Sequence, residues 1–160
     1  MDHFDSLLTA MLLRAGADVR RGTDIGLSPL HVAAMWGLAF IIPTLLAAGA
    51  EVGAIWEDDR EWEVPLLTPL EATINFMNEH GTSGLDRTRE FAMLLRAGAI
   101  IPRGTDLPPY LDAVARAGGY AQYEKAHRTR LAAIFIPKFP RVPAEIIPTI
   151  VAFWADCGGH

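Results

Sequence analysis

Apolar positions along the chain form short helical patterns that end in the same phrase. The stretches AMLLRAGADVRRGTD, from Ala10, and AMLLRAGAIIPRGTD, from Ala92, are identical at twelve of fifteen positions. The core of the phrase, Leu-Leu-x-x-Gly-Ala, occurs a third time from Leu45. A glycine follows each leucine pair, where a helix can end in a left-handed residue. The phrase therefore predicts a helix end that is used in several structural units, with the leucines filling the space between layers.

A second phrase alternates with the first and predicts helix starts. It reads SPLH from Ser28, TPLE from Thr68 and, more weakly, PYL from Pro109. A hydroxyl before a proline suits a helix start, because the hydroxyl accepts from an orphan backbone N–H and proline needs no acceptor there. Glu71 completes a capping box with Thr68, and His31 at the same position is expected to bond the Ser28 hydroxyl in a structural role.

These phrases, with a period of 33 residues between the first two leucine pairs, resemble the ankyrin repeat. The resemblance implies an all-α fold, an ankyrin-repeat solenoid of helix-turn-helix units with hairpin loops and a C-terminal helix. We expect a repeat array over 1–136, followed by a proline-rich connection and a C-terminal capping or F-box-like helix over 137–160. The expected units lie near 1–22, 23–55, 56–104 and 105–136, with hairpin turns at Arg-Gly-Thr-Asp 21–24 and 103–106.

The third unit is expanded, since 49 residues instead of 33 separate Gly49 from Gly98. Part of the insertion lengthens the hairpin loop EVGAIWEDDREWEVPLLTP, which places tryptophans among acidic residues. In ankyrin arrays the hairpin tips and first helices form the concave face, and tryptophan commonly anchors interfaces. We expect this loop to contact a partner protein with a basic patch through Trp56, Asp58, Asp59, Arg60, Glu61 and Trp62. The alternative is that both indoles fold back onto the array while the acidic residues keep the loop solvated.

The C-terminal segment combines prolines with a broad apolar surface. Pro137, Pro140 and Pro143 predict an extended connection, with Pro143 in the first turn of a helix that Pro148 bends. The apolar residues of that helix, which include Trp154, recur at helical spacing. A terminal helix with such a surface is suited to cap the exposed end of a repeat array.

Pro-x-Glu-Ile from Pro143 resembles the start of an F-box. Ankyrin repeats followed by a shortened terminal F-box are similar to the PRANC arrangement of large DNA viruses. In that family the terminal helices recruit the adaptor subunit of cullin-type ubiquitin ligases, and the repeats select the target. The resemblance implies an adaptor-facing surface made of Pro143, Glu145, Ile146, Ile150 and Phe153. Capping alone and capping combined with adaptor binding both remain open.

Composition and charge narrow the compartment and the partners. A net charge of −5 without a Lys/Arg cluster disfavours nucleic acid and anionic membranes as partners. The uncharged stretch from Ile25 to Ala50 is interrupted by Gly37 and Pro43, which predicts two short helices rather than a membrane span. The lone Cys157 and an N-terminus unlike a signal peptide predict an intracellular protein, cytoplasmic or nuclear.

Motifs for catalysis are not recognisable in the sequence. It holds no glycine-rich phosphate loop after a strand and no His/Cys metal set, and its five histidines are scattered. We therefore expect no enzyme and no cofactor, but a non-catalytic protein–protein interaction module that binds through its concave face and acidic hairpin. The alternative is a substrate-recruiting adaptor of a cullin-type ubiquitin ligase.

Overall fold

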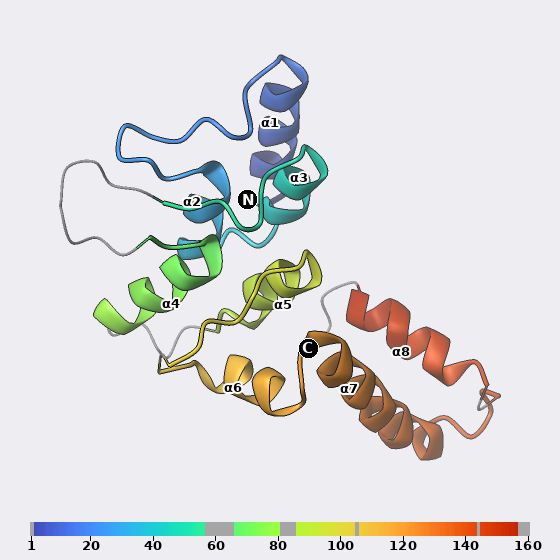
Figure 1. Ribbon diagram of the computed structural model, residues 1–160. Helices are drawn as coiled ribbons and strands as arrows, with labels where there is room; N and C mark the ends of the chain where they lie inside the picture. The colour runs from blue at the N-terminus through green and yellow to red at the C-terminus, as the bar shows by residue number, and fades with distance from the viewer. Residues whose placement is uncertain (1, 57–65, 81–85, 105, 144, 157–160) are drawn as a thin grey trace. The chain divides into compact units, whose positions relative to one another are not determined.

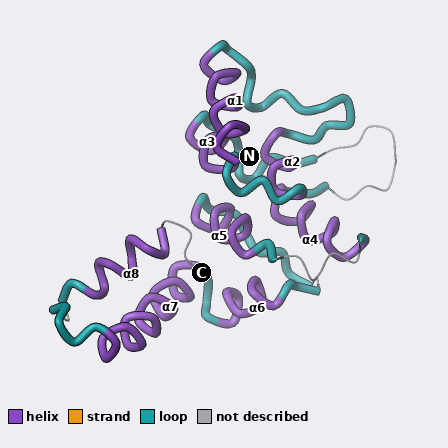
Figure 2. The backbone as a smooth tube through the Cα atoms, turned by 180° about the vertical axis from the view of Figure 1, so that it is seen from behind, coloured by secondary structure: helices purple, strands orange, loops and turns teal. Residues whose placement is uncertain are grey.

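Helices follow one another along the described part of the chain, joined by loops and tight turns (Figure 1). The computed structural model describes residues 2–56, 66–80, 86–104, 106–143 and 145–156. Among these residues there is no strand (Figure 2). An isolated antiparallel β-bridge joins Trp56 and Leu67. The predicted all-α class is confirmed at this level.

The chain divides into two compact units, Met1–Leu111 and Asp112–His160. The boundary between these units lies within one helix. The division after residue 136 stays a prediction. None of the described helices has the length and apolar character needed to cross a membrane. The helices are α1 (Asp2–Arg14), α2 (Pro29–Met35), α3 (Ile42–Ala47), α4 (Pro69–Glu79), α5 (Thr88–Arg96), α6 (Pro109–Arg116), α7 (Tyr120–Phe135), the 3₁₀ helix η2 (Ile136–Lys138) and α8 (Ile147–Asp156).

The starts of α2 and α4 have the caps that the sequence predicts. Ser28 is extended at the N-cap of α2, and its hydroxyl accepts the His31 backbone N–H at 3.4 Å. At the start of α4 the Thr68 hydroxyl accepts the Glu71 backbone N–H, while the Glu71 carboxylate accepts the Thr68 backbone N–H at 2.9 Å. Both sets of bonds satisfy orphan donors of a first turn.

The repeated leucine–glycine phrase is a helix C-cap. Gly16, Gly49 and Gly98 have φ of +93°, +91° and +100°, which favours glycine over residues with a Cβ. In all three copies the glycine N–H donates to the carbonyl of the second leucine at 3.0–3.1 Å. The following alanine N–H donates to the carbonyl of the first leucine at 2.9–3.0 Å. The phrase therefore recurs because it ends three helices with the same Schellman motif.

Within the Met1–Leu111 unit the helices stack in two rows. Helix α2 packs against α4, and α3 packs against both α1 and α5, while α2 and α3 also contact each other. The apolar core lies between these helices; its fully buried side chains include Leu30, Ile42, Leu70, Ile74, Phe91 and Leu94. The helices that begin at a Ser/Thr-Pro phrase thus pack on each other, and so do the helices that end in the leucine–glycine phrase.

The first predicted hairpin turn is shifted along the chain. Backbone bonds from Gly26 N–H to Thr23 O and from Thr23 N–H to Leu27 O, both 2.9 Å, place the turn at Thr23–Gly26. The left-handed position belongs to Gly26, with φ of +81°. The predicted turn at 21–24 is therefore two residues too early, and part of the second predicted turn, 103–106, falls outside the described residues.

The proline-rich connection is compact, so the predicted extended connection is wrong. Helix η2 continues α7, and Phe139 N–H donates to Phe135 O at 3.1 Å. A further turn joins Val142 N–H to Phe139 O at 2.9 Å. A 3₁₀ helix tolerates Pro137 because the ring fixes a φ compatible with helical backbone.

The start of α8 also differs from the prediction. Helix α8 begins at Ile147, so Pro143 precedes it, and Pro148 lies in its first turn and does not bend its interior. The first turn has no intrahelical acceptors for its N–H groups, and the missing N–H of Pro148 is therefore harmless there.

Candidate functional site

The expanded loop begins and ends at a pair of bonded residues. Trp56 N–H donates to Leu67 O at 2.8 Å, and the Trp56 indole N–H donates to Ile25 O at 2.7 Å. Trp56 is half-buried. This indole is folded back onto its own chain, as the alternative interpretation of the loop expects. The other predicted partner-binding residues of the loop, which are Asp58, Asp59, Arg60, Glu61 and Trp62, lie outside the described residues.

His31 connects the same loop base to α2. The fully buried imidazole has Nδ1 2.7 Å from the Ser28 hydroxyl, as predicted, and Nε2 3.0 Å from Leu67 O. A carbonyl only accepts, so Nε2 carries the proton and Nδ1 accepts from Ser28. Burial lowers the pKa of His31, and the bond to Leu67 opposes that shift in part. We call Ile25, Ser28, His31, Trp56 and Leu67 the loop-base cluster.

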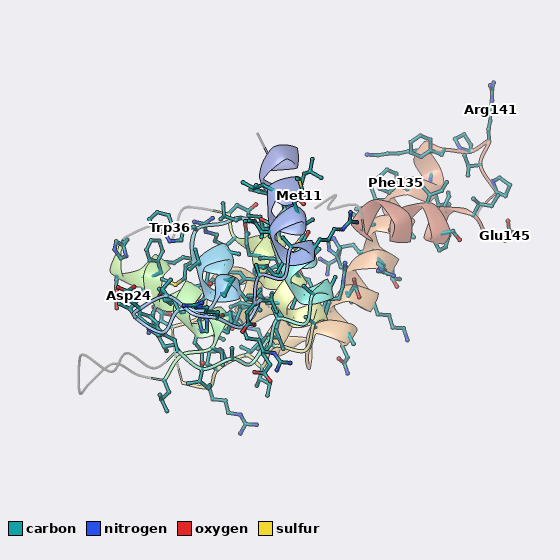
Figure 3. All side chains as sticks on the ribbon, turned by 90° about the horizontal axis from the view of Figure 1, so that it is seen from above. Met11, Asp24, Trp36, Phe135, Arg141 and Glu145 are labelled. Atoms are coloured by element: carbon teal, nitrogen blue, oxygen red, sulfur yellow. The ribbon has the colours of Figure 1, made fainter. Side chains whose placement is uncertain are left out.

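A row of aromatic rings, exposed at Trp36 and His80 and half-buried at Phe76, joins the ends of α2 and α4. Trp36 lies at the C-cap of α2 (Figure 3). It is 64% exposed, and its ring centroid lies 5.7 Å from that of Phe76. Phe76 stacks on His80 with centroids 4.3 Å apart. We call these three residues the aromatic surface. Sequence reasoning missed it, because Trp36 continues the apolar pattern of α2 and only its exposure distinguishes it from a core residue.

A polar cavity of about 680 Å³ lies in the same unit. Sequence reasoning missed this cavity as well. The signal in the sequence was a group of charged residues at the start of α5. When the leucine–glycine phrases are aligned, the corresponding positions before α3 are apolar. Its lining consists of Ser6, Gly37, Ala39, Phe40, Asp86, Arg87, Arg89 and Glu90.

The Asp112–His160 unit has an apolar groove of about 350 Å³ formed by the end of α7, the turn that follows η2, and α8. Its floor includes the buried Ile147 and Val151, whereas Ile150 is 51% exposed and Phe139 is similarly open. The described side chains that line the groove are all apolar: Phe135, Phe139, Val142, Ile147, Ile150 and Val151.

The residues predicted to cap the array or face an adaptor are only partly gathered at this groove. Ile150 lines it, and Ile146 is exposed at the turn before α8. Pro143 and Glu145 lie on the connection between α7 and α8, where Glu145 is exposed (Figure 3). Phe153 and Trp154 belong to α8, but their side chains lie outside those described.

Comparisons with protein-family models, curated proteins and solved structures give no match to the chain. The function is therefore inferred from the arrangement of its own surfaces.

Proposed function

We propose that the chain is an ankyrin-type solenoid that acts as a non-catalytic protein–protein interaction module. The packing of α2 on α4 and of α3 on α1 and α5 supports this proposal, since such an array stacks equivalent helices of successive units. The shared C-caps and the Ser/Thr-Pro helix starts support the same repeat.

The aromatic surface is the observation that carries the proposed binding function. Large exposed aromatic side chains are enriched among the residues that dominate interface energies. Trp36 and Phe76 lie on the first helices of neighbouring units, which contribute to the concave face in ankyrin arrays. Trp36 is therefore the proposed central anchor for the partner.

The composition of the expanded loop indicates the chemistry of the partner. Residues 57–65 contain five acidic residues and one arginine. Asp58, Asp59, Arg60, Glu61 and Trp62 remain the proposed contacts for a basic patch, while Trp56 is assigned to the loop base. An acidic loop beside an aromatic anchor favours a partner that presents cationic side chains around an apolar pocket.

Trp36→Ala in the full chain tests this function. Quantitative affinity purification with mass spectrometry compares wild type, Trp36→Ala and Ile100→Ala, a control whose side chain is 85% exposed. Loss of a hot-spot tryptophan is expected to weaken the affinity for the partner by at least tenfold, about 1.4 kcal/mol. This affinity is measured with the purified proteins. Circular dichroism checks that each variant is folded. Equal partner recovery by Trp36→Ala and wild type would contradict the proposal.

The apolar groove favours a second candidate function, recruitment of a cullin-type ligase adaptor. Exposed Ile150, Phe139 and Ile146 offer an apolar contact that a capping role alone does not require. Purified adaptor subunit should bind wild type and Ile134→Ala, an exposed α7 control, but bind Ile150→Ala more weakly. Failure of the wild-type chain to bind the adaptor leaves capping as the role of α8.

A further inference from the structure

The polar cavity of the Met1–Leu111 unit has walls from three parts of the stack. Ser6 comes from α1, Gly37, Ala39 and Phe40 come from the turn between α2 and α3, and the charged residues come from the start of α5. Four charged residues therefore share one cavity with apolar ones.

The repeat itself shows that these charges are unusual. With Leu94 aligned on Leu45, the positions of Arg87, Arg89 and Glu90 correspond to Leu38, Phe40 and Ile41 in the preceding unit. An aliphatic residue at position 90 would fill the same place without desolvating a charge. The helix stack does not need a carboxylate there, so its presence calls for another explanation.

Glu90 is an orphan acceptor. Its residue is only 4% exposed, and its Oε2 atom is buried without a hydrogen-bond partner. Burying a carboxylate oxygen without a donor is strongly unfavourable, so this atom calls for a donor from outside the chain. Because Glu90 lines the cavity, a ligand that enters it can supply the missing N–H.

Arg87 offers the complementary orphan donor. Its Nη2 donates to Met35 O at 3.3 Å, which fixes the guanidinium at the end of α2, while its Nε is buried without an acceptor. Gly37 makes room for this group, since a Cβ there would lie 1.4 Å from Nη1. One cavity thus holds an unsatisfied carboxylate oxygen and an unsatisfied N–H three residues apart.

We propose that this cavity receives a lysine or arginine side chain of the partner protein. The cationic head pairs with Glu90 Oε2, a neighbouring carbonyl oxygen of the partner accepts from Arg87 Nε, and the apolar stem lies along Ala39 and Phe40. The inference rests on the proposed function in that the ligand belongs to a protein. It adds a defined pocket for one basic residue of that partner.

Small capped amino acids test the pocket without the partner. The probes are N-acetyl-lysine amide and N-acetyl-arginine amide at millimolar concentrations, added to the ¹⁵N-labelled full chain while backbone amide shifts are recorded. We expect saturable shifts at Gly37 and Ala39 with both cationic probes and none with N-acetyl-norleucine amide, which has the stem without the charge. Glu90→Gln should weaken binding at least tenfold, whereas the exposed control Glu79→Gln should leave it unchanged.

Several results would overturn the inference. These are no saturable shift with either cationic probe, equal shifts with N-acetyl-norleucine amide, or unchanged binding by Glu90→Gln. If Glu90→Gln fails to fold, Arg87→Gln takes its place, with the same weakening expected because the carbonyl loses its donor.

Trp36→Ala separates this inference from the proposed function. The variant should bind the capped probes like wild type, because Trp36 does not line the cavity. If a protein partner requires Trp36 but the capped probes do not bind, the proposed pocket is ruled out and the proposed function stands. Probe binding without any reproducible protein partner would instead contradict the proposed function.

Discussion

At the scale of single residues, His31 is the group that joins two helix starts. Its Nδ1 accepts from Ser28, the N-cap of α2, and its Nε2–H donates to Leu67 O, directly before the N-cap of α4. Leu67 O also accepts from Trp56 N–H, so both of its lone pairs are used. The neutral imidazole therefore fixes the base of the expanded loop relative to α2.

The folded chain is expected to lose stability in mild acid because of His31. Burial lowers the pKa of His31 below 6.5, so between the folded pKa and 6.5 the unfolded chain binds more protons. The contribution of neutral His31 to the free energy of unfolding is complete above about pH 6.5. It falls as the pH is lowered, by about 1.4 kcal/mol for each unit that separates the folded and unfolded pKa values. Urea unfolding followed by circular dichroism across this range measures it.

His31→Gln should remove this component of the pH dependence while lowering stability at neutral pH. His80→Gln, which changes an exposed ring, should retain the wild-type slope. Parallel stability curves for wild type and His31→Gln would show that His31 does not cause the pH dependence.

Side-chain hydrogen bonds between residues close in the sequence were predictable, and those between distant residues were not. The His31–Ser28 bond spans three residues and was predicted from one phrase, because a helix start fixes both groups locally. The bonds from His31 to Leu67 and from Trp56 to Ile25 span 36 and 31 residues. No pattern in the sequence encodes which carbonyl such a side chain meets, since that depends on how the units stack.

At the scale of elements, helix starts marked by a capping residue could be predicted from the sequence. The start of α8 could not, because two prolines nearby both suit a first helical turn. The starts of α2 and α4 agree with the sequence prediction, because their caps specify them. For α8, both Pro143 and Pro148 suit a first turn. The turn in which Ile146 N–H donates to Pro143 O at 3.0 Å places the start at the second proline.

Two glycine substitutions should separate backbone strain from steric contact. In Gly98→Ala the backbone keeps φ near +100° and nothing lies within 4 Å of the new Cβ. The variant should therefore lose only the stability that a left-handed alanine costs, about 1–2 kcal/mol. Gly37→Ala adds a clash with the Arg87 guanidinium and breaks its bond to Met35, for roughly 1 kcal/mol more. Chemical denaturation measures both free energies of unfolding.

Gly53→Ala is the matched control, because its Cβ meets nothing and its φ lies outside the left-handed region. It should change stability by less than about 0.5 kcal/mol. Equal losses for Gly37→Ala and Gly98→Ala would mean that Arg87 leaves its place at no cost, which would weaken the case for a preformed pocket.

At the scale of the whole molecule, the two compact units differ in how their helices are covered. The first has an extensive apolar core, whereas α7 contributes no buried residue to the second. Helix α7 was predicted to be the second helix of a fourth repeat, yet it packs extensively on α8. Its weak amphipathic pattern did not indicate a packing face, so the sequence did not distinguish the two arrangements.

Removal of α8 should loosen α7 first. In a chain that ends at Phe139, α7 loses the helix that packs on it, so its amide hydrogens should exchange faster. Those of α2, α4 and α5 should keep their protection, because their buried residues lie in the Met1–Leu111 unit. Hydrogen exchange with mass spectrometry resolves these segments. Val151→Ala, at a buried position, should also speed exchange in α7, to a smaller extent, whereas Ile150→Ala, at an exposed position, should not.

The result decides how α8 is to be understood. If α7 alone loses protection, α7 and α8 form a separate helical hairpin, and its apolar groove is available for an adaptor or another protein. If the shortened chain unfolds throughout, α8 is needed for the fold of the whole chain. The apolar residues along it would then act as the cap that a repeat array requires at its end.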